Sequence, residues 1–211
     1  MKVLGICLSP RKNGNSEILL RQALKGAKEL GAKIEFLSIR KMKIEPCNGC
    51  LGCRTAGVCR IKDDMRDVYP KFLEADGIIF ATPVYFWSLP GGGKVFLDRT
   101  YALRFPTLQL MNKVVAAISV ASSSGNVEVL SVFNMYFLTN HMITTDYVAG
   151  YAMNKETIKK HKHAMFAAYE LGRLVSSVIS KGFKYPEEFN KPIYTLVKDK
   201  CGVHQCPYEN D

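Results

Sequence analysis

Four cysteines within thirteen residues form the strongest chemical motif of this 211-residue chain. The pattern is C-x2-C-x2-C-x5-C, and its members are Cys47, Cys50, Cys53 and Cys59. Four thiolates can bind a [4Fe-4S] cluster, and consecutive short spacings let one loop wrap around three of its corners. Gly49 and Gly52 lie between the cysteines and permit this tight wrapping. The spacing therefore favours an iron-sulfur cluster on residues 47–59.

Zinc and free redox thiols are the alternatives for the same four cysteines. Zinc also binds four thiolates, but structural zinc sites usually pair two C-x2-C arms across a longer loop, and residues 47–59 contain no second arm. Seven cysteines without a recognisable secretion signal indicate metal or redox chemistry rather than disulfides. Cys7 is expected to be an inert core thiol, and Cys201 and Cys206 are expected to be ordinary thiols of the C-terminal segment.

A polar loop near the N-terminus has the composition of a phosphate site. Its candidate residues are Ser9, Pro10, Arg11, Asn13, Gly14, Asn15 and Ser16. Hydroxyl and amide side chains offer donors, Arg11 offers a charged fork, Gly14 allows close backbone approach, and the following helix contributes its N-terminal N–H groups. In an open parallel sheet this first turn is the usual phosphate site. An ordinary capped turn is the alternative, because these residue types are common there.

Two further segments are expected at the same edge of the sheet. The first comprises Thr82, Pro83, Val84, Tyr85, Phe86 and Trp87, and the second contributes Ser122 and Gly125. A flat isoalloxazine ring needs a stacking surface and backbone groups at its polar edge, which the aromatic segment provides. The three segments together predict an FMN site. The alternative is that the aromatic residues belong to the core or to an interface.

The elements that position these segments follow from alternating strand and helix periodicities, which predict a doubly wound parallel α/β sheet. Strands are expected at 3–8, 32–39, 77–82, 113–119 and 142–148, and helices at 16–30, 65–75, 93–103, 126–140 and 155–181. The expected strand order is 2-1-3-4-5, with a cysteine loop after strand 2 that leaves from the flavin side of the molecule. We expect one domain over 1–182 and an extended tail over 183–211, packed on the domain or on a neighbouring subunit.

The composition is that of an ordinary soluble globular protein, with 47% hydrophobic and 23% charged residues. No run approaches the ~20 apolar residues that cross a bilayer, and the short apolar opening lacks the pattern of a signal peptide. We therefore expect a cytoplasmic protein without membrane contact. The net charge is +10, but Lys and Arg are spread along the chain. This spread favours a solvated basic surface, or an acidic redox partner, over nucleic acid.

Several short motifs resemble the NAD(P)H-dependent FMN reductases, a flavodoxin-like family. They are Ser9-Pro10-Arg11, Asn15-Ser16, Pro83-Val84-Tyr85-Phe86 and Asp98-Arg99. The resemblance extends to the fifth expected strand and implies that Ser9, Arg11, Asn15 and Ser16 bind the FMN phosphate, while the segment from Pro83 to Trp87 frames the ring. The chain departs from that family at Leu8, where Gly is usual, and at Ser122-Ser123-Ser124, where glycines are typical.

A flavodoxin-like FMN domain that also carries a compact cysteine loop is similar to the iron-sulfur flavoprotein family. This resemblance implies that the four cysteines of residues 47–59 are cluster ligands. It also implies a homo-oligomer, a dimer or tetramer, in which the cluster of one subunit lies near the FMN of another.

The sequence thus predicts an FMN-dependent oxidoreductase that transfers electrons between a one-electron donor such as ferredoxin, a [4Fe-4S] cluster, FMN and a small-molecule acceptor. No catalytic side chain is needed, because the cofactors carry the redox chemistry. One alternative is an FMN-dependent NAD(P)H reductase without a cluster. The other is a non-catalytic, metal-stabilised binding scaffold.

Overall fold

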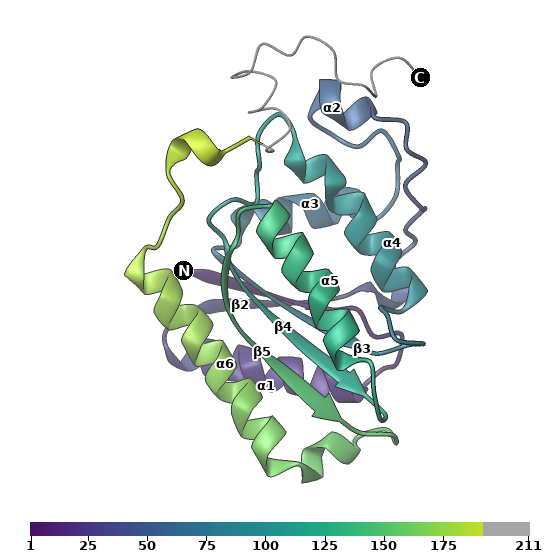
Figure 1. Cartoon of the computed structure of the whole chain (residues 1–211), viewed down its shortest axis with the longest axis vertical. Helices are drawn as coiled ribbons and strands as arrows, with labels where there is room; N and C mark the ends of the chain where they lie inside the picture. The colour runs from purple at the N-terminus through teal and green to yellow at the C-terminus, as the bar shows by residue number, and fades with distance from the viewer. Residues whose placement is uncertain (192–211) are drawn as a thin grey trace.

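The computed structural model describes residues 1–191, which fold around a five-stranded parallel sheet of order β2-β1-β3-β4-β5 (Figure 1). The strands are β1 (Lys2–Cys7), β2 (Lys33–Ser38), β3 (Gly77–Pro83), β4 (Val114–Ala121) and β5 (Ile143–Tyr151). Every residue of β4 is buried, as expected for an apolar strand covered on both faces. The predicted sheet and its strand order are confirmed.

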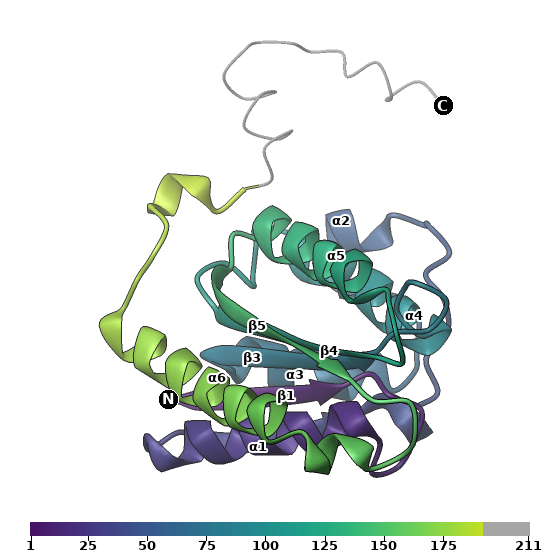
Figure 2. The same ribbon diagram turned by 60° about the horizontal axis from the view of Figure 1, so that its bottom comes forward.

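Helices cover both faces of the sheet (Figure 2). They are α1 (Asn15–Glu29), α2 (Gly52–Ala56), α3 (Met65–Glu74), α4 (Gly91–Arg99), α5 (Asn126–Thr139) and α6 (Lys162–Lys181). One hydrophobic core lies between the sheet and α1 with α6, and it includes Leu20 and Val175. The other lies between the sheet and α3, α4 and α5, and it includes Phe72, Phe96 and Phe133. This three-layer arrangement leaves the carboxyl ends of the strands open to a ligand.

Two glycines allow α1 and α6 to cross in direct backbone contact. A Cβ at Gly172 would lie 1.7 Å from the backbone oxygen of Ala23, and one at Gly26 would lie 2.0 Å from that of Tyr169. Neither position can accept any other side chain without separating the helices. The position of α1, the helix that follows the phosphate loop, is therefore fixed by backbone packing against α6 as well as by side-chain contacts.

The last expected helix, 155–181, begins later than the periodicity predicts. Residues Thr157–Lys160 form a 3-10 turn, Glu156 has a φ of 65°, and α6 starts only at Lys162. A non-local contact explains the difference: the amide of Asn15 donates to the backbone oxygen of Asn154 at 2.8 Å and accepts from the N–H of Ile158 at 3.4 Å. Ile158 is fully buried, which holds this turn against the sheet.

Three connecting 3-10 segments complete the described part of the chain: Ile39–Lys41, Thr100–Arg104 and Glu187–Phe189. The second continues α4, so the expected helix 93–103 is an α-helix followed by a tighter turn. The short helix α2 inside the cysteine loop has no counterpart in the sequence prediction. No helix of residues 1–191 combines the length and apolarity needed to cross a membrane.

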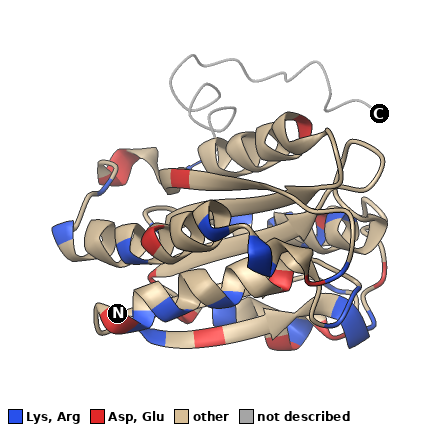
Figure 3. Ribbon diagram, turned by 90° about the horizontal axis from the view of Figure 1, so that it is seen from below, with Lys and Arg blue, Asp and Glu red and all other residues tan. Residues whose placement is uncertain are grey.

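The first part of the expected tail packs on the domain. The N–H of Tyr185 donates to Oδ1 of Asn112 at 2.7 Å, the N–H of Leu108 donates to the oxygen of Asn190 at 2.8 Å, and the rings of His141 and Tyr185 stack. Cys201 and Cys206 lie outside the described residues. Lys and Arg are distributed over several elements in Figure 3, with Asp and Glu among them.

Candidate functional site

Three loops leave the sheet at the carboxyl ends of its central strands. The register aligns Cys7 of β1 with Ala81 of β3, and Pro83 of β3 with Val120 of β4. Because all these strands are parallel, the loops that follow them emerge at one edge. The structure thus brings together the phosphate loop, the aromatic segment and the small polar loop that the sequence singled out; we call this edge the flavin rim.

The phosphate loop presents backbone donors at the start of α1. Ser9, Gly14 and Ser16 are buried in it, whereas Arg11 is exposed, and the N–H of Arg11 donates to Oγ of Ser9 at 3.2 Å. Gly14 is the N-cap residue, and as a glycine it has no side chain that could cap the helix. The N–H groups and the dipole of an uncapped helix favour an anion such as phosphate.

Two side chains of this loop serve other purposes. Asn15 ties the loop to the segment after β5, as described above, so its amide is engaged in the protein. Glu17, which the sequence analysis did not single out, is only 6% exposed and accepts from the N–H of Asn13 at 2.9 Å. Glu17 lies in the first turn of the helix, where an acidic side chain is favoured by the free N–H groups and the dipole, and this position was the signal that could have revealed it.

The aromatic segment forms a tight turn that stands out from the rim. The N–H of Tyr85 donates to the oxygen of Ser88 at 2.9 Å, and the N–H of Ser88 donates back at 3.0 Å. Between them, Phe86 and Trp87 have φ angles of 48° and 58°. Left-handed conformations cost such residues about 1–3 kcal/mol each, and they concentrate at functional sites.

Both central side chains of this turn are solvent-exposed, Phe86 by 92% and Trp87 by 55%. The alternative that they are core residues is therefore wrong for this subunit. Their rings lie 4.9 Å apart in an edge-to-face arrangement. Exposed aromatic faces held in a strained turn offer the stacking surface that a flat ring requires.

The third loop lies directly against the aromatic turn because Gly125 has no side chain. A Cβ there would lie 2.6 Å from Cγ1 of Val84 and 3.2 Å from Cα of Trp87. Next to it, Asn126 is 3% exposed; its Nδ2 donates to the oxygen of Gly150, while its Oδ1 has no hydrogen-bond partner in the described part of the chain. Ser122 is exposed at the same loop. These residues fit a ring edge rich in polar groups.

The cysteine loop keeps its four thiols in one neighbourhood at the protein surface. Cys47 and Cys50 are exposed, and Cys53 and Cys59 are half-buried. Burial raises the pKa of Cys53, and negative charge on the other three cysteines raises it further. Within residues 1–191, no three Cys, His, Asp or Glu side chains meet in a metal-binding arrangement. The loop therefore supplies the donor set of a cluster, four thiols on one short loop, without the closed coordination geometry.

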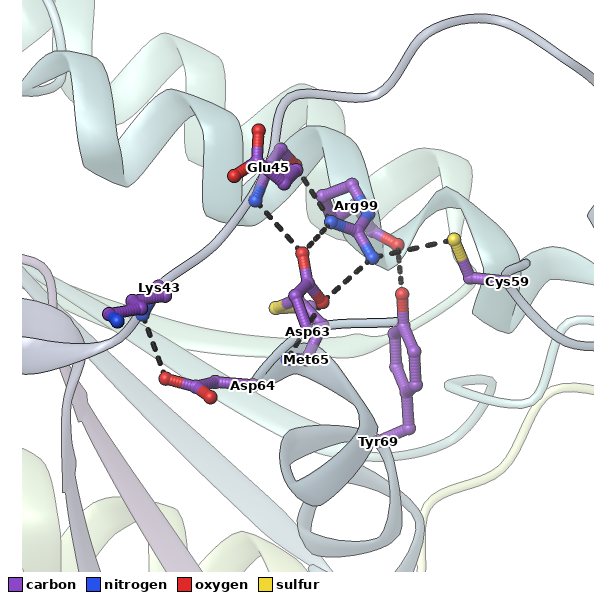
Figure 4. Close-up of polar contacts among 8 residues, drawn as sticks. All are labelled: Lys43, Glu45, Cys59, Asp63, Asp64, Met65, Tyr69 and Arg99. Atoms are coloured by element: carbon purple, nitrogen blue, oxygen red, sulfur yellow. Dashed lines mark hydrogen bonds and ion pairs between the residues drawn. The ribbon is translucent and has the colours of Figure 1, made fainter. Parts of the chain in front are cut away.

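Arg99 anchors this loop from the end of α4 (Figure 4). Its guanidinium forms a buried ion pair with Asp63, donates to the backbone oxygen of Glu45 at 2.7 Å, and approaches Sγ of Cys59 at 3.4 Å. Tyr69 donates to the backbone oxygen of Arg99 at 3.0 Å. Although burial opposes its charged form, hydrogen bonds from Arg99, Glu45 and Met65 lower the pKa of Asp63. A single buried arginine thus holds both ends of the cysteine loop.

The cysteine loop leaves the sheet from the flavin side, as expected, because β2 ends beside β1, with Ser38 opposite Cys7. The loop follows β2 but runs to the far end of α4, where Arg99 meets Cys59, whereas the aromatic turn directly precedes Gly91 at the other end (Figure 1). Nine helical residues span ~13 Å at 1.5 Å per residue. The loop and the flavin rim of one subunit therefore lie at opposite ends of α4.

The fold and the rim loops define a flavodoxin-like protein. Residues 1–155 match the model of NADPH-dependent FMN reductase. An iron-sulfur flavoprotein of Methanocaldococcus jannaschii is 35% identical and covers 85% of this chain and 97% of its own. Another from Archaeoglobus fulgidus is 30% identical and covers 99% of this chain and 96% of its own.

The chain therefore belongs to the NADPH-dependent FMN reductase family and, within it, to the iron-sulfur flavoproteins. A solved structure of a flavone reductase agrees, with a TM-score of 0.69 at 25% identity; the match covers 88% of this chain and just under two thirds, 66%, of that one. The protein is an FMN-dependent oxidoreductase. The alternative of a non-catalytic scaffold is therefore excluded.

Proposed function

We propose that this protein is an electron-transfer iron-sulfur flavoprotein that connects a ferredoxin-like one-electron donor to a small-molecule acceptor. When bound, a [4Fe-4S] cluster supplies one-electron transfer and FMN supplies both one- and two-electron transfer. The observation that carries the proposal is the cysteine loop, because four cysteines within thirteen residues, on a loop anchored by Arg99, are added to an FMN fold that does not need them.

The chain's own residues divide the binding work between two sites. Cys47, Cys50, Cys53 and Cys59 would hold the cluster. The start of α1, with Ser9, Arg11 and Ser16, would hold the FMN phosphate, while the turn around Phe86 and Trp87 and the loop at Gly125 would hold the ring. Pro10, Asn13, Thr82, Pro83, Tyr85 and Ser122 complete the rim.

We further propose a homo-oligomer in which the cysteine loop of one subunit reaches the flavin rim of another. The separation of the two sites along α4 supports this, since both belong to one electron path yet lie apart in a single subunit. Apolar side chains are available for the interface: Tyr147, Tyr151, Met153 and Phe166 are each more than half exposed around the edge strand β5. Exposed apolar groups of this kind mark contact surfaces.

The composition of protein purified without oxygen tests the proposal. We expect iron and acid-labile sulfide in the ratio of a [4Fe-4S] cluster, together with FMN. Cys53→Ser should lose the iron and keep the FMN, because the residues assigned to FMN belong to the three rim loops and not to the cysteine loop. Cys7→Ala is the matched control, since Cys7 is buried in the sheet core and should not affect either cofactor.

FMN with no iron in the wild-type protein would contradict the proposal and support the reductase without a cluster. Zinc in place of iron would contradict it as well. Equal iron content in Cys53→Ser and the wild type would show that the cysteine loop does not bind the metal.

A further inference from the structure

The buried guanidinium of Arg99 donates toward a sulfur atom, which is a chemical role beyond anchoring a loop. Nη2 lies 3.4 Å from Sγ of Cys59, and the same nitrogen lies 3.0 Å from Oδ1 of Asp63. Arg99 as a residue is 2% exposed, and the side chain of Asp63 is 5% exposed. We propose that Arg99 is a positioning residue that clamps the cysteine loop and raises the reduction potential of its cluster through an N–H···S bond to Cys59. This inference rests on the proposed function.

The clamp follows from the fork geometry of the guanidinium. Nη1 donates to the backbone oxygen of Glu45, two residues before Cys47, and both Nη atoms pair with Asp63, four residues after Cys59. Asp63 in turn accepts from the N–H of Glu45 at 2.8 Å. The two ends of the loop are thus joined to each other and to α4 through one planar group, which a lysine cannot reproduce because its ammonium is a single point of donation.

The expected effect of Arg99 on the reduction potential of the cluster follows from the positive charge of its guanidinium. One-electron reduction adds one negative charge to the cluster and its thiolates, so hydrogen-bond donors and positive charge near the sulfurs favour the reduced state. The guanidinium faces Cys59, and its positive charge favours the reduced cluster. The carboxylate of Asp63 pairs with the same guanidinium, and its negative charge disfavours the reduced cluster. Because Arg99 and Asp63 are both buried, salt screens their fields much less than those of surface charges. The two residues should therefore shift the potential in opposite directions.

Two substitutions with opposite expected signs test this. In Arg99→Gln, we expect the ratio of reduced to oxidised cluster at a fixed potential to fall about tenfold, which is ~59 mV for a one-electron couple. Arg99→Lys keeps the charge but not the fork and should give a smaller fall. In Asp63→Asn the ratio should rise, because the amide can still accept from Arg99 while the opposing charge is gone.

The measurement is an anaerobic redox titration of the holoprotein, with the cluster followed by electron paramagnetic resonance and FMN by its visible absorption. The FMN couple is the internal reference and should move less than the cluster couple, since Arg99 bonds Glu45, Cys59 and Asp63 and no residue of the rim. Arg173→Lys is the matched control, because Arg173 of α6 forms a surface ion pair with Glu29 of α1, and it should leave both couples unchanged.

Unchanged cluster potentials in iron-loaded Arg99 variants, or shifts of the same sign in Arg99→Gln and Asp63→Asn, would overturn the inference. If both Arg99 variants lose iron, the sign in Asp63→Asn decides: a rise supports the tuning role and no rise refutes it. Failure of the proposed function is distinguishable, because the wild-type protein would then contain no iron-sulfur cluster to titrate.

Discussion

Gly125 and Val84 lie so close that a Cβ on residue 125 would come within 2.6 Å of Cγ1 of Val84. The two residues belong to different loops, one after β4 and one after β3, and their contact closes the flavin rim between these strands. The backbone of Gly125 also has a φ of +96°, which other residues rarely adopt. Both features make the absence of a side chain at this position a requirement of the site.

Gly125→Ala should therefore destabilise the protein by about 1–3 kcal/mol and weaken FMN binding, because the methyl group pushes the third loop away from the aromatic turn. Chemical denaturation of the apoprotein and an FMN titration measure the two effects. Gly31→Ala is the matched control: its φ is +84°, but nothing lies within 4 Å of the added methyl. Equal FMN affinity in the two variants would contradict the role assigned to Gly125.

Because the aromatic turn is strained, we expect a substitution that relieves the strain to stabilise the apoprotein and to weaken FMN binding. Trp87→Gly should raise the free energy of unfolding of the apoprotein by about 1 kcal/mol, since Gly adopts a φ of 58° without cost. The same variant should weaken FMN binding about three- to tenfold, because a stacking surface is lost. Phe183→Ala removes another exposed aromatic side chain, beyond the far end of α6, and should leave FMN binding unchanged. A Trp87→Gly protein that is less stable than the wild type would show that the backbone of Trp87 is not strained.

An ion-pair network on the edge strand β2 predicts a pH dependence of stability. Hydrogen bonds from Lys2 and Lys71 lower the pKa of Glu35 below its ordinary 4.5. The ionised form of Glu35 is thus favoured by folding, so its contribution is fully present above pH 4.5 and disappears as the pH falls through the lowered pKa.

Glu35→Gln should accordingly cost about 1 kcal/mol at pH 7, and the difference from the wild type should shrink below pH ~4. Urea denaturation of both proteins across this range measures it. A difference that is independent of pH would mean that Glu35 acts through packing and not through its charge.

The fold could be predicted well from local patterns, whereas the details of the site depend on contacts between distant residues. Apolar runs such as 77–82 and the alternation of strands with helices were sufficient for a parallel sheet, whereas its strand order came from the known doubly wound order 2-1-3-4-5. The helix expected at 155–181 was wrong at its start, because Asn15 holds the preceding turn from 139 residues away. The hydrophobic periodicity of a local segment contains no information about such a long-range contact.

The cysteine loop illustrates the same limit. Its ligand spacing is a local pattern and was readable, but its place at the far end of α4 depends on Arg99, Asp63 and Glu45, which only the folded chain brings together. An arginine three residues after the apolar Phe96, on the same face of the expected helix, was the available signal. It was noted only as part of the Asp98-Arg99 motif, without a role.

The central claim is that electrons from a one-electron donor reach FMN by way of the cysteine loop. Rapid mixing of the oxidised holoprotein with reduced ferredoxin, without oxygen, tests it when the bleaching of FMN absorption is followed in the wild type and in Cys53→Ser. The account predicts rapid bleaching in the wild type and its loss in the variant, with FMN bound in both. Equally fast bleaching in Cys53→Ser would contradict it.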